Sequence, residues 1–159
     1  MGKEIERKFL VTSDIWRDAA VSKSYLKQGY LAATGATVRV RLYDEEAFLT
    51  IKGRPEGLVR SEYEYPIPVD EACEMLSGLS VYPPVEKYRY IVPAGNGLFW
   101  EVDEYLGDNA PLFTAEIELP EPDTPFEIPA WLGEEVSGNS KYTNRSLSRF
   151  PYSLWHQEA

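Results

Sequence analysis

Glu4-Ile5-Glu6-Arg7-Lys8-Phe9-Leu10-Val11 is the stretch around which the rest of this sequence can be organised. With the side-chain period of two that a β-strand imposes, Glu4, Glu6 and Lys8 fall on one face. The apolar side chains fall on the other face together with Arg7, which we assign to the outer surface. Two carboxylates at alternate positions offer hard oxygen ligands to a divalent cation, and an ammonium lies just beyond them for a phosphate. Taken alone, so short a motif is explained better by an edge strand with a solvated charged face, so the remaining strands must decide.

The composition narrows both the class of protein and the kind of metal site. The 159 residues suit one domain, 1–159, and they include a single cysteine, Cys73, and a single histidine, His156. Carboxylates must therefore hold any metal ion, because a cysteine- or histidine-rich centre is excluded. A net charge of −10 argues against binding to nucleic acid or to an anionic membrane. The charged N-terminus and the lack of a long apolar run predict a cytoplasmic protein.

Eight segments are predicted to be β-strands: seven show the same alternation of polar and apolar side chains, and 24–31 is rich in strand-forming residues. They are 4–11, 24–31, 37–43, 47–53, 59–67, 85–92, 98–106 and 112–119. Four prolines mark 120–129 as a surface loop, and the C-terminal segment of about 129–159 is expected to be helical and to pack on the strands.

Helices are expected between and after the strands. Their positions are after a cap at Ser13 or Asp14, after a cap at Asp70, at Trp131-Leu132 and within 142–155. In the helix that follows Asp70, Cys73 shares the apolar side and is expected in the core.

Like charges lie two residues apart on one face in five of the strands. The pairs are Arg39/Arg41, Glu62/Glu64, Lys87/Arg89, Glu101/Asp103 and Glu116/Glu118. Such pairs repel unless opposite charges or a ligand lie between them, and a solvated surface would mix the signs more evenly. The helices need the apolar strand faces, which leaves the charged faces to face one another around a small ligand. We therefore predict an α+β fold, an eight-stranded antiparallel β-barrel with a charged interior and helices packed outside.

The ordered set of charged motifs resembles the signature of a known family. It comprises Glu4-x-Glu6-x-Lys8, Arg39-x-Arg41, Lys52, Glu62-x-Glu64, Lys87-x-Arg89, Asp103 and Glu116-x-Glu118. This set resembles the CYTH superfamily, the triphosphate tunnel metalloenzymes, from the first strand to the segment 141–144. The resemblance implies an eight-stranded antiparallel tunnel that binds a triphosphate and divalent cations. Small bacterial members of this length are similar to inorganic tripolyphosphatases, whereas other branches hydrolyse thiamine triphosphate or make cyclic AMP.

The chemistry of the side chains suggests a role for each position. Phosphate oxygens are expected to bind the basic residues Lys8, Arg39, Arg41, Lys52, Lys87 and Arg89. Mg²⁺ or Mn²⁺ is expected to bind the carboxylates Glu4, Glu6, Glu116 and Glu118. Three carboxylates have roles that stay open, Glu62, Glu64 and Asp103. They could orient a water, complete a second metal site or simply neutralise the basic residues, and we weigh this last, structural role equally with the others. The resemblance associates two catalytic positions with water activation, Lys8 and Tyr30, and Lys141 is left without a role.

The predicted reaction is metal-dependent hydrolysis of a triphosphate, first of all inorganic tripolyphosphate and then nucleoside triphosphates, with release of phosphate. An adenylate cyclase, a thiamine triphosphatase and a polyphosphate-binding module without catalysis are the alternatives. The cyclase would need a base pocket, and the binding module would not need the carboxylates. The expected partner is a small-molecule triphosphate rather than nucleic acid or a membrane, with a homodimer as an open alternative to a monomer.

Overall fold

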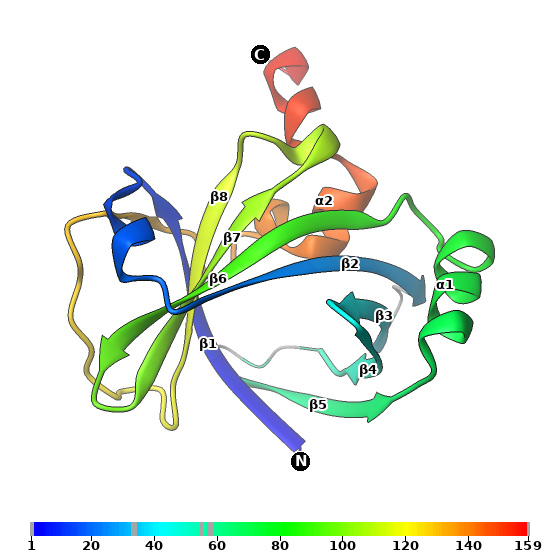
Figure 1. Cartoon of the computed structure of the whole chain (residues 1–159), viewed down its shortest axis with the longest axis horizontal. Coiled ribbons are helices and arrows are strands. Elements are labelled where there is room, and N and C mark those ends of the chain that lie inside the picture. The colour runs from blue at the N-terminus through cyan, green and yellow to red at the C-terminus, as the bar shows by residue number, and fades with distance from the viewer. Residues whose placement is uncertain (1, 33–34, 55, 57–58, 159) are drawn as a thin grey trace.

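Nine antiparallel strands wind into one closed sheet in the computed structural model, which describes residues 2–32, 35–54, 56 and 59–158, with side chains from Ile5 to Trp155 (Figure 1). The strands are β1 (Gly2–Val11), β2 (Ser22–Ala32), β3 (Thr37–Tyr43), β4 (Glu46–Lys52), β5 (Val59–Pro66), β6 (Val85–Gly95), β7 (Leu98–Tyr105), β8 (Phe113–Glu118) and β9 (Leu132–Glu135). Their order is β5-β4-β3-β2-β6-β7-β8-β1-β9, and a β5–β1 pairing closes the first eight into a barrel. The predicted eight-stranded antiparallel barrel is confirmed.

The closure of the barrel depends on β1, the strand with which the sequence begins. Its first half pairs with β5, with Ile5 opposite Val59, and its second half pairs with β8, with Glu6 opposite Glu118. A strand long enough to change partners midway leaves no open edge between β5 and β8. Its alternating faces also carry Glu6 and Lys8 inward and the apolar residues outward, as predicted.

The ninth strand corrects the sequence prediction of a short helix at Trp131-Leu132. Trp131 lies in a turn, and Leu132 begins β9, which pairs with the end of β1 opposite Val11 and Phe9. Leu132 is buried against the apolar outer face of the barrel. A further outward residue of β1, Arg7, forms a two-pronged ion pair with Glu135 at 2.6 and 2.8 Å, which confirms its outer position. Tertiary pairing therefore overrode a weak local helical signal.

Apolar side chains on the outer face of β1, β6, β7 and β8 form the largest core cluster. Phe9 and Trp100 pack edge to face with ring centroids 5.7 Å apart, and Phe126 of the loop between β8 and β9 covers both. Trp131 packs against Trp100 from the same side, with centroids 5.6 Å apart. The barrel thus has its apolar core outside the sheet, under loops and helices, because the inside is charged.

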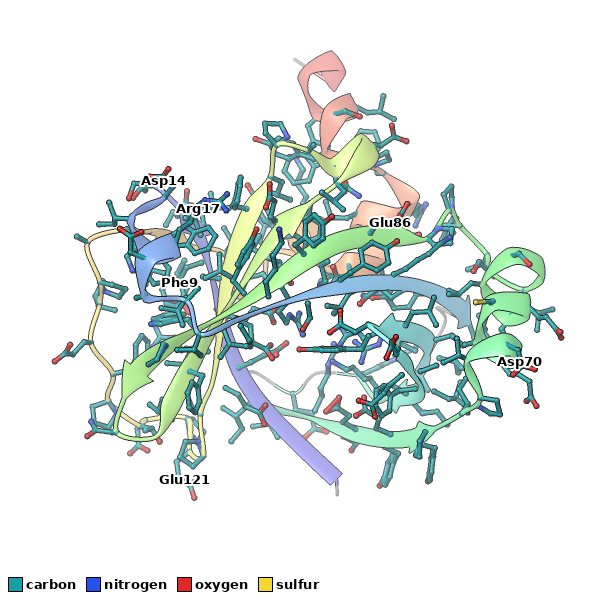
Figure 2. All side chains as sticks on the ribbon, viewed as in Figure 1. Phe9, Asp14, Arg17, Asp70, Glu86 and Glu121 are labelled. Atoms are coloured by element: carbon teal, nitrogen blue, oxygen red, sulfur yellow. The ribbon has the colours of Figure 1, made fainter. Side chains whose placement is uncertain are left out.

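The helix α1 (Val69–Gly78) covers the outer face of β3 and β4 (Figure 1). Its buried residues Ala72 and Leu76 pack on that face. Two details of the prediction are wrong: the N-cap residue is Pro68, with Asp70 in the first turn on the outer side of the helix (Figure 2), and Cys73 is exposed. The apolar stripe is narrower than expected, so Cys73 falls beside it. Among the described residues, none of the helices has the length and apolarity needed to cross a bilayer.

Gly29 of β2 gives a test of this packing. A Cβ on Gly29 would lie 2.9 Å from Cδ2 of Leu76 in α1 and 2.5 Å from Oγ of Ser80, which follows the C-terminal end of that helix. We expect Gly29→Ala to lower the free energy of unfolding by about 1–3 kcal/mol, because the helix end must move away from the sheet. Gly78→Ala, with no atom within 4 Å of the added Cβ, is the matched control and should change stability by less than about 1 kcal/mol. Urea unfolding measures both, and equal losses would contradict the close packing.

The C-terminal segment contains less helix than predicted, and its α-helix packs at an end of the barrel rather than on the outer face. After the 3₁₀ turns η1 (Ile15–Ala19), η2 (Gly107–Asn109) and η3 (Ser140–Tyr142), the chain forms α2 (Asn144–Arg149) and the 3₁₀ helix η4 (Tyr152–Glu158). Pro151 separates the last two and explains why one continuous helix does not form. Leu147 of α2 packs with Val85 and Tyr105. In β7 the side chain of Tyr105 has the same parity as the inward-facing Asp103, so α2 covers an end of the barrel interior rather than its outer face.

The predicted cap of the first helix also needs correction. The segment after Asp14 is the 3₁₀ helix η1, and the Asp14 side chain makes no capping hydrogen bond to it. Trp16 anchors the turn by burial against Tyr90, with ring centroids 4.9 Å apart.

Candidate active site

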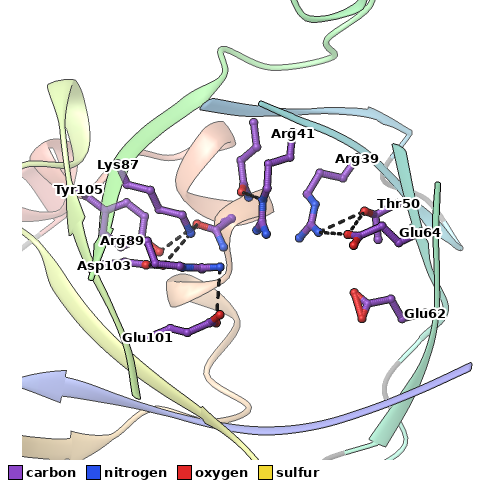
Figure 3. A network of polar contacts seen from close by, with 12 residues as sticks. Arg39, Arg41, Thr50, Glu62, Glu64, Lys87, Arg89, Glu101, Asp103 and Tyr105 are labelled. Atoms are coloured by element: carbon purple, nitrogen blue, oxygen red, sulfur yellow. Dashed lines mark hydrogen bonds and ion pairs between the residues drawn. The ribbon is translucent and has the colours of Figure 1, made fainter. Parts of the chain in front are cut away.

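A cavity of about 290 Å³ runs inside the barrel and is lined almost entirely by polar and charged side chains. Its lining residues are Glu6, Lys8, Tyr30, Thr37, Arg39, Arg41, Lys52, Arg60, Glu62, Glu64, Arg89, Glu101, Glu116, Glu118, Thr143, Asn144 and Arg145. The alternation of each strand places most of them there, because every second residue of a barrel strand faces inward. Thr143, Asn144 and Arg145 come from the start of α2. Figure 3 shows basic and acidic side chains reaching into the same space from different walls.

Two arginines of β3 form the centre of the basic wall. Arg39 is buried, and its Nη2 donates to Thr50 Oγ1 at 3.3 Å and lies 3.8 Å from Glu64 Oε1. Arg41 Nε donates to Gln28 Oε1 at 2.8 Å. Burial, and then the positive charges of Arg39 and Arg89, lower the pKa of Arg41 to about 9. An anion that binds between cations this close together reduces the repulsion between them.

Arg89 completes the basic wall from β6, where Asp103 of β7 holds it. Its Nε and Nη2 donate to the two oxygens of Asp103 at 2.8 and 2.9 Å, and its Nη1 lies 3.4 Å from Glu101 Oε1. Burial alone would raise the pKa of the Asp103 carboxyl, but Arg89 and Lys87 outweigh it and hold that pKa well below its ordinary value. A two-pronged carboxylate pair fixes the plane of a guanidinium and leaves its remaining edge directed elsewhere.

Lys87, which we expected to bind phosphate, is buried and is absent from the cavity lining among the described residues. Its Nζ donates to Asp103 Oδ2 at 2.7 Å and to Asn144 Oδ1 at 3.2 Å, and it lies 5.3 Å from the ring centre of Tyr105. Burial, and then Arg89 and Arg41, lower the pKa of Lys87, while Asp103 opposes that shift. These contacts hold Lys87 beside Arg89, and its predicted role in phosphate binding stays a prediction.

Carboxylates of β1, β7 and β8 form the acidic wall. Glu6 lies opposite Glu118 in the β1–β8 register, and Glu116 lies opposite both Lys8 in β1 and Glu101 in β7. Burial would raise the pKa of Glu116, but Lys8 and Arg89 lower it to about 2, so this carboxyl is ionised at neutral pH.

The acidic wall has the donor chemistry that a hard divalent cation requires. Glu6 and Glu116 lie within hydrogen-bonding reach of each other, and carboxylates this close are stabilised by a cation between them. Together with Glu118 they offer carboxylate oxygens that suit Mg²⁺ or Mn²⁺. Among the side chains from Ile5 to Trp155, no set of three His, Cys, Asp and Glu is already arranged to hold a metal ion. Glu4, the fourth predicted ligand, lies in β1 with its side chain outside the described residues.

The two predicted water-activating residues both reach the cavity. Lys8 Nζ donates to the backbone oxygen of Tyr142 at 2.9 Å, which ties the first strand to the segment before α2. Tyr30 is buried in β2, lines the cavity with its side chain and accepts a hydrogen bond from Gln28 Nε2 at 3.1 Å.

The remaining predicted carboxylates, Glu62 and Glu64 of β5, line the cavity and pair with cations of the neighbouring strands. Glu62 Oε1 lies 3.7 Å from the Nζ of Lys52, and Glu64 accepts from Thr50 at 2.9 Å beside Arg39. These contacts favour charge neutralisation for both residues, as the pairing of Asp103 does for that residue.

Several lining residues were given no role by the sequence prediction. Glu101 was expected on the inward face beside Asp103 but was assigned no function. Arg60 was not singled out, although it has the same parity as Glu62 and Glu64. Asn144 and Arg145 come from α2, where the strand period gives no signal, and Arg145 Nη1 donates to Thr37 Oγ1 at 3.4 Å. Lys141 lies outside the cavity lining, with its Nζ 4.4 Å from the ring centre of Trp155.

Comparisons with known proteins agree with this architecture. The family model of the CYTH domain matches residues 2–150. A protein of Acetivibrio thermocellus named inorganic triphosphatase is 46% identical over 153 residues, which are 96% of this chain and 97% of that protein. A Nitrosomonas europaea protein with the same name is 37% identical over 149 residues, 91% and 96% of the two chains. A crystal structure of an inorganic triphosphatase matches with a TM-score of 0.67 and 35% identity, over 91% of this chain and 93% of the other.

Proposed function

We propose that this chain, which belongs to the CYTH domain family, is a divalent-metal-dependent hydrolase of triphosphates that acts on inorganic tripolyphosphate. The observation that supports this most directly is one cavity with Arg39, Arg41 and Arg89 on one side and the side chains of Glu6, Glu116 and Glu118 on another. A triphosphate needs the basic wall for its oxygens, and a phosphate-bound cation needs the acidic wall. The relatives named inorganic triphosphatase support the same activity.

Residues of this chain would act on the substrate mainly by position and charge. Arg39, Arg41 and Arg89 bind phosphate oxygens, and Asp103 keeps Arg89 in the orientation that allows it. Glu6, Glu116 and Glu118, with Glu4, would hold Mg²⁺ or Mn²⁺, which when bound neutralises charge that develops on the phosphate oxygens. Water attacks the terminal phosphorus, the bond from that phosphorus to the bridging oxygen breaks, and the products are phosphate and pyrophosphate.

The lining of the cavity favours an inorganic substrate over a nucleotide. Among the described lining residues, Tyr30 is the one aromatic side chain, and the others are charged or polar. A nucleobase buried there would lose water contacts without gaining an apolar or stacking surface. An adenylate cyclase would need such a surface. The cytoplasmic location, a homodimer and the choice between Mg²⁺ and Mn²⁺ stay predictions.

The test is a substrate panel on the purified protein. We expect phosphate release from tripolyphosphate with Mg²⁺ or Mn²⁺ at neutral to alkaline pH, loss of that activity in EDTA, and a lower kcat/KM for ATP and thiamine triphosphate. Products from ATP separate the rivals, because a hydrolase yields ADP and phosphate whereas a cyclase yields cyclic AMP and pyrophosphate. Tight tripolyphosphate binding without turnover would overturn the proposal in favour of a binding module.

A further inference from the structure

Gln28 is a fully buried amide located behind the cavity wall and not among its described lining residues. It lies in β2 directly opposite Arg41 of β3, and Tyr30 follows it on the same inward face. Its Oε1 accepts from Arg41 Nε at 2.8 Å, and its Nε2 donates to the Tyr30 hydroxyl oxygen at 3.1 Å. One amide therefore touches two side chains that reach the cavity, one from each of two adjacent strands.

The donors and acceptors in this trio allow one orientation of the amide. A guanidinium has no acceptor, so the Gln28 oxygen must face Arg41 and the amide nitrogen must face Tyr30. The amide nitrogen can only donate, so the phenol oxygen of Tyr30 must accept. The phenol proton then cannot point at Gln28, and among the described residues Tyr30 has no other side-chain or backbone acceptor. It is free for an acceptor inside the cavity.

We propose that Gln28 is a positioning residue that orients the Arg41 guanidinium and sets the Tyr30 hydroxyl as a hydrogen-bond donor to a phosphate oxygen of the bound triphosphate. The inference rests on the proposed function for the identity of that anion. It gives Tyr30 a role that differs from the water activation implied by the family resemblance. A tyrosine that takes the proton of the water must be a phenolate, whereas a hydroxyl that donates to the substrate is the neutral phenol and keeps its proton.

The surroundings of Arg41 strengthen its dependence on Gln28. Among the described residues, Gln28 Oε1 is the acceptor of the one hydrogen bond that Arg41 makes. The charges of Arg39 and Arg89 repel the Arg41 guanidinium, and the charge of Glu101 opposes them in part. A partly buried guanidinium with one neutral acceptor and two like charges nearby is held in place weakly without that acceptor. Removing the amide thus affects both the guanidinium and the hydroxyl.

A double-mutant cycle with Gln28→Met and Tyr30→Phe tests the proposal. Methionine keeps the length of the side chain and removes both polar contacts. We expect each single variant to lower kcat/KM for tripolyphosphate about ten- to a hundredfold, the effect of losing one hydrogen bond to a charged group. Because part of the Gln28 effect passes through Tyr30, Gln28→Met should cost several-fold less in the Tyr30→Phe background than in the wild type. Independent, multiplicative effects would overturn the assignment, as would an unchanged kcat/KM for Gln28→Met.

Two controls separate positioning from damage to the fold and from failure of the proposed function. Ser148→Ala removes the hydrogen bond of a buried hydroxyl to Pro83 O outside the cavity and should leave kcat/KM unchanged.

If Gln28→Met does not fold, Gln28→Glu replaces it in the cycle. Its carboxylate still accepts from Arg41 but also accepts the Tyr30 proton, which then no longer points into the cavity, so the same coupling is expected. If the wild type does not hydrolyse tripolyphosphate, the proposed function fails, and the cycle is read instead from the calorimetric Kd of tripolyphosphate in EDTA. Coupling in Kd then supports the inference, and its absence refutes it.

Discussion

Replacing Asp103 by Asn is expected to lower the free energy of unfolding at pH 7 by about 3–5 kcal/mol, the usual effect of leaving buried charges without their partner. Asp103 is fully buried and is the shared acceptor of Lys87 at 2.7 Å and of Arg89 at 2.8 and 2.9 Å. An amide keeps the shape but offers one acceptor and no charge to two cations. Activity on tripolyphosphate should fall as well, because Arg89 loses its fixed orientation.

The pH dependence of stability gives the same prediction a second readout. The pKa of Asp103 is held well below its ordinary value in the folded protein, so the unfolded chain binds more protons as the pH falls through the ordinary range near 4. The stability contributed by Asp103 is thus fully present above about pH 4 and is lost at lower pH. The difference between the wild type and Asp103→Asn should shrink below pH 4.

Urea unfolding from pH 3 to 7 measures both effects. The control is Glu135→Gln, which removes the partly exposed partner of Arg7 on β9 and should cost at most about 1 kcal/mol. A loss at Asp103 as small as that at Glu135 would contradict a supporting role for the Lys87–Asp103–Arg89 group.

Glu6→Gln is expected to lower metal-dependent turnover of tripolyphosphate about a hundredfold or more, since it removes one charged ligand from the acidic wall. Glu6 lines the cavity opposite Glu118 and within reach of Glu116, and glutamine keeps its size. The Mn²⁺ concentration that gives half-maximal rate should rise, and calorimetry should show weaker Mn²⁺ binding.

The matched control for Glu6→Gln is Glu104→Gln. Glu104 also lies on a barrel strand, but it faces outward, where it accepts from Tyr90 at 3.0 Å. Its replacement should leave the Mn²⁺ dependence unchanged. A Glu6→Gln variant with normal turnover and normal Mn²⁺ binding would place the metal elsewhere in the cavity.

The sequence predicted the barrel and most of the cavity lining because both follow from one short-range property. Alternation along a strand places Glu6 and Lys8 together and Arg7 opposite, whatever the strand pairs with. The same parity placed Arg39, Arg41, Glu62 and Glu64 inside. Where the local signal was weak or not strand-like, the prediction was wrong or silent, as for β9 and for the α2 residues Asn144 and Arg145.

Which face of a strand a side chain occupies, and how far along the barrel it lies, thus depend on different interactions. The opening stretch 4–11 contains enough information to say which side chains turn inward, because the backbone period of two is local. The position of a side chain along the barrel, and the residues that it contacts, depend on segments that are distant in the sequence. Lys87 shares its face with Arg89 but lies further toward the end covered by α2, and Gln28 became significant only when Arg41 and Tyr30 were brought beside it. These arrangements depend on strand register and on packing between segments far apart in the sequence, which only the tertiary structure decides.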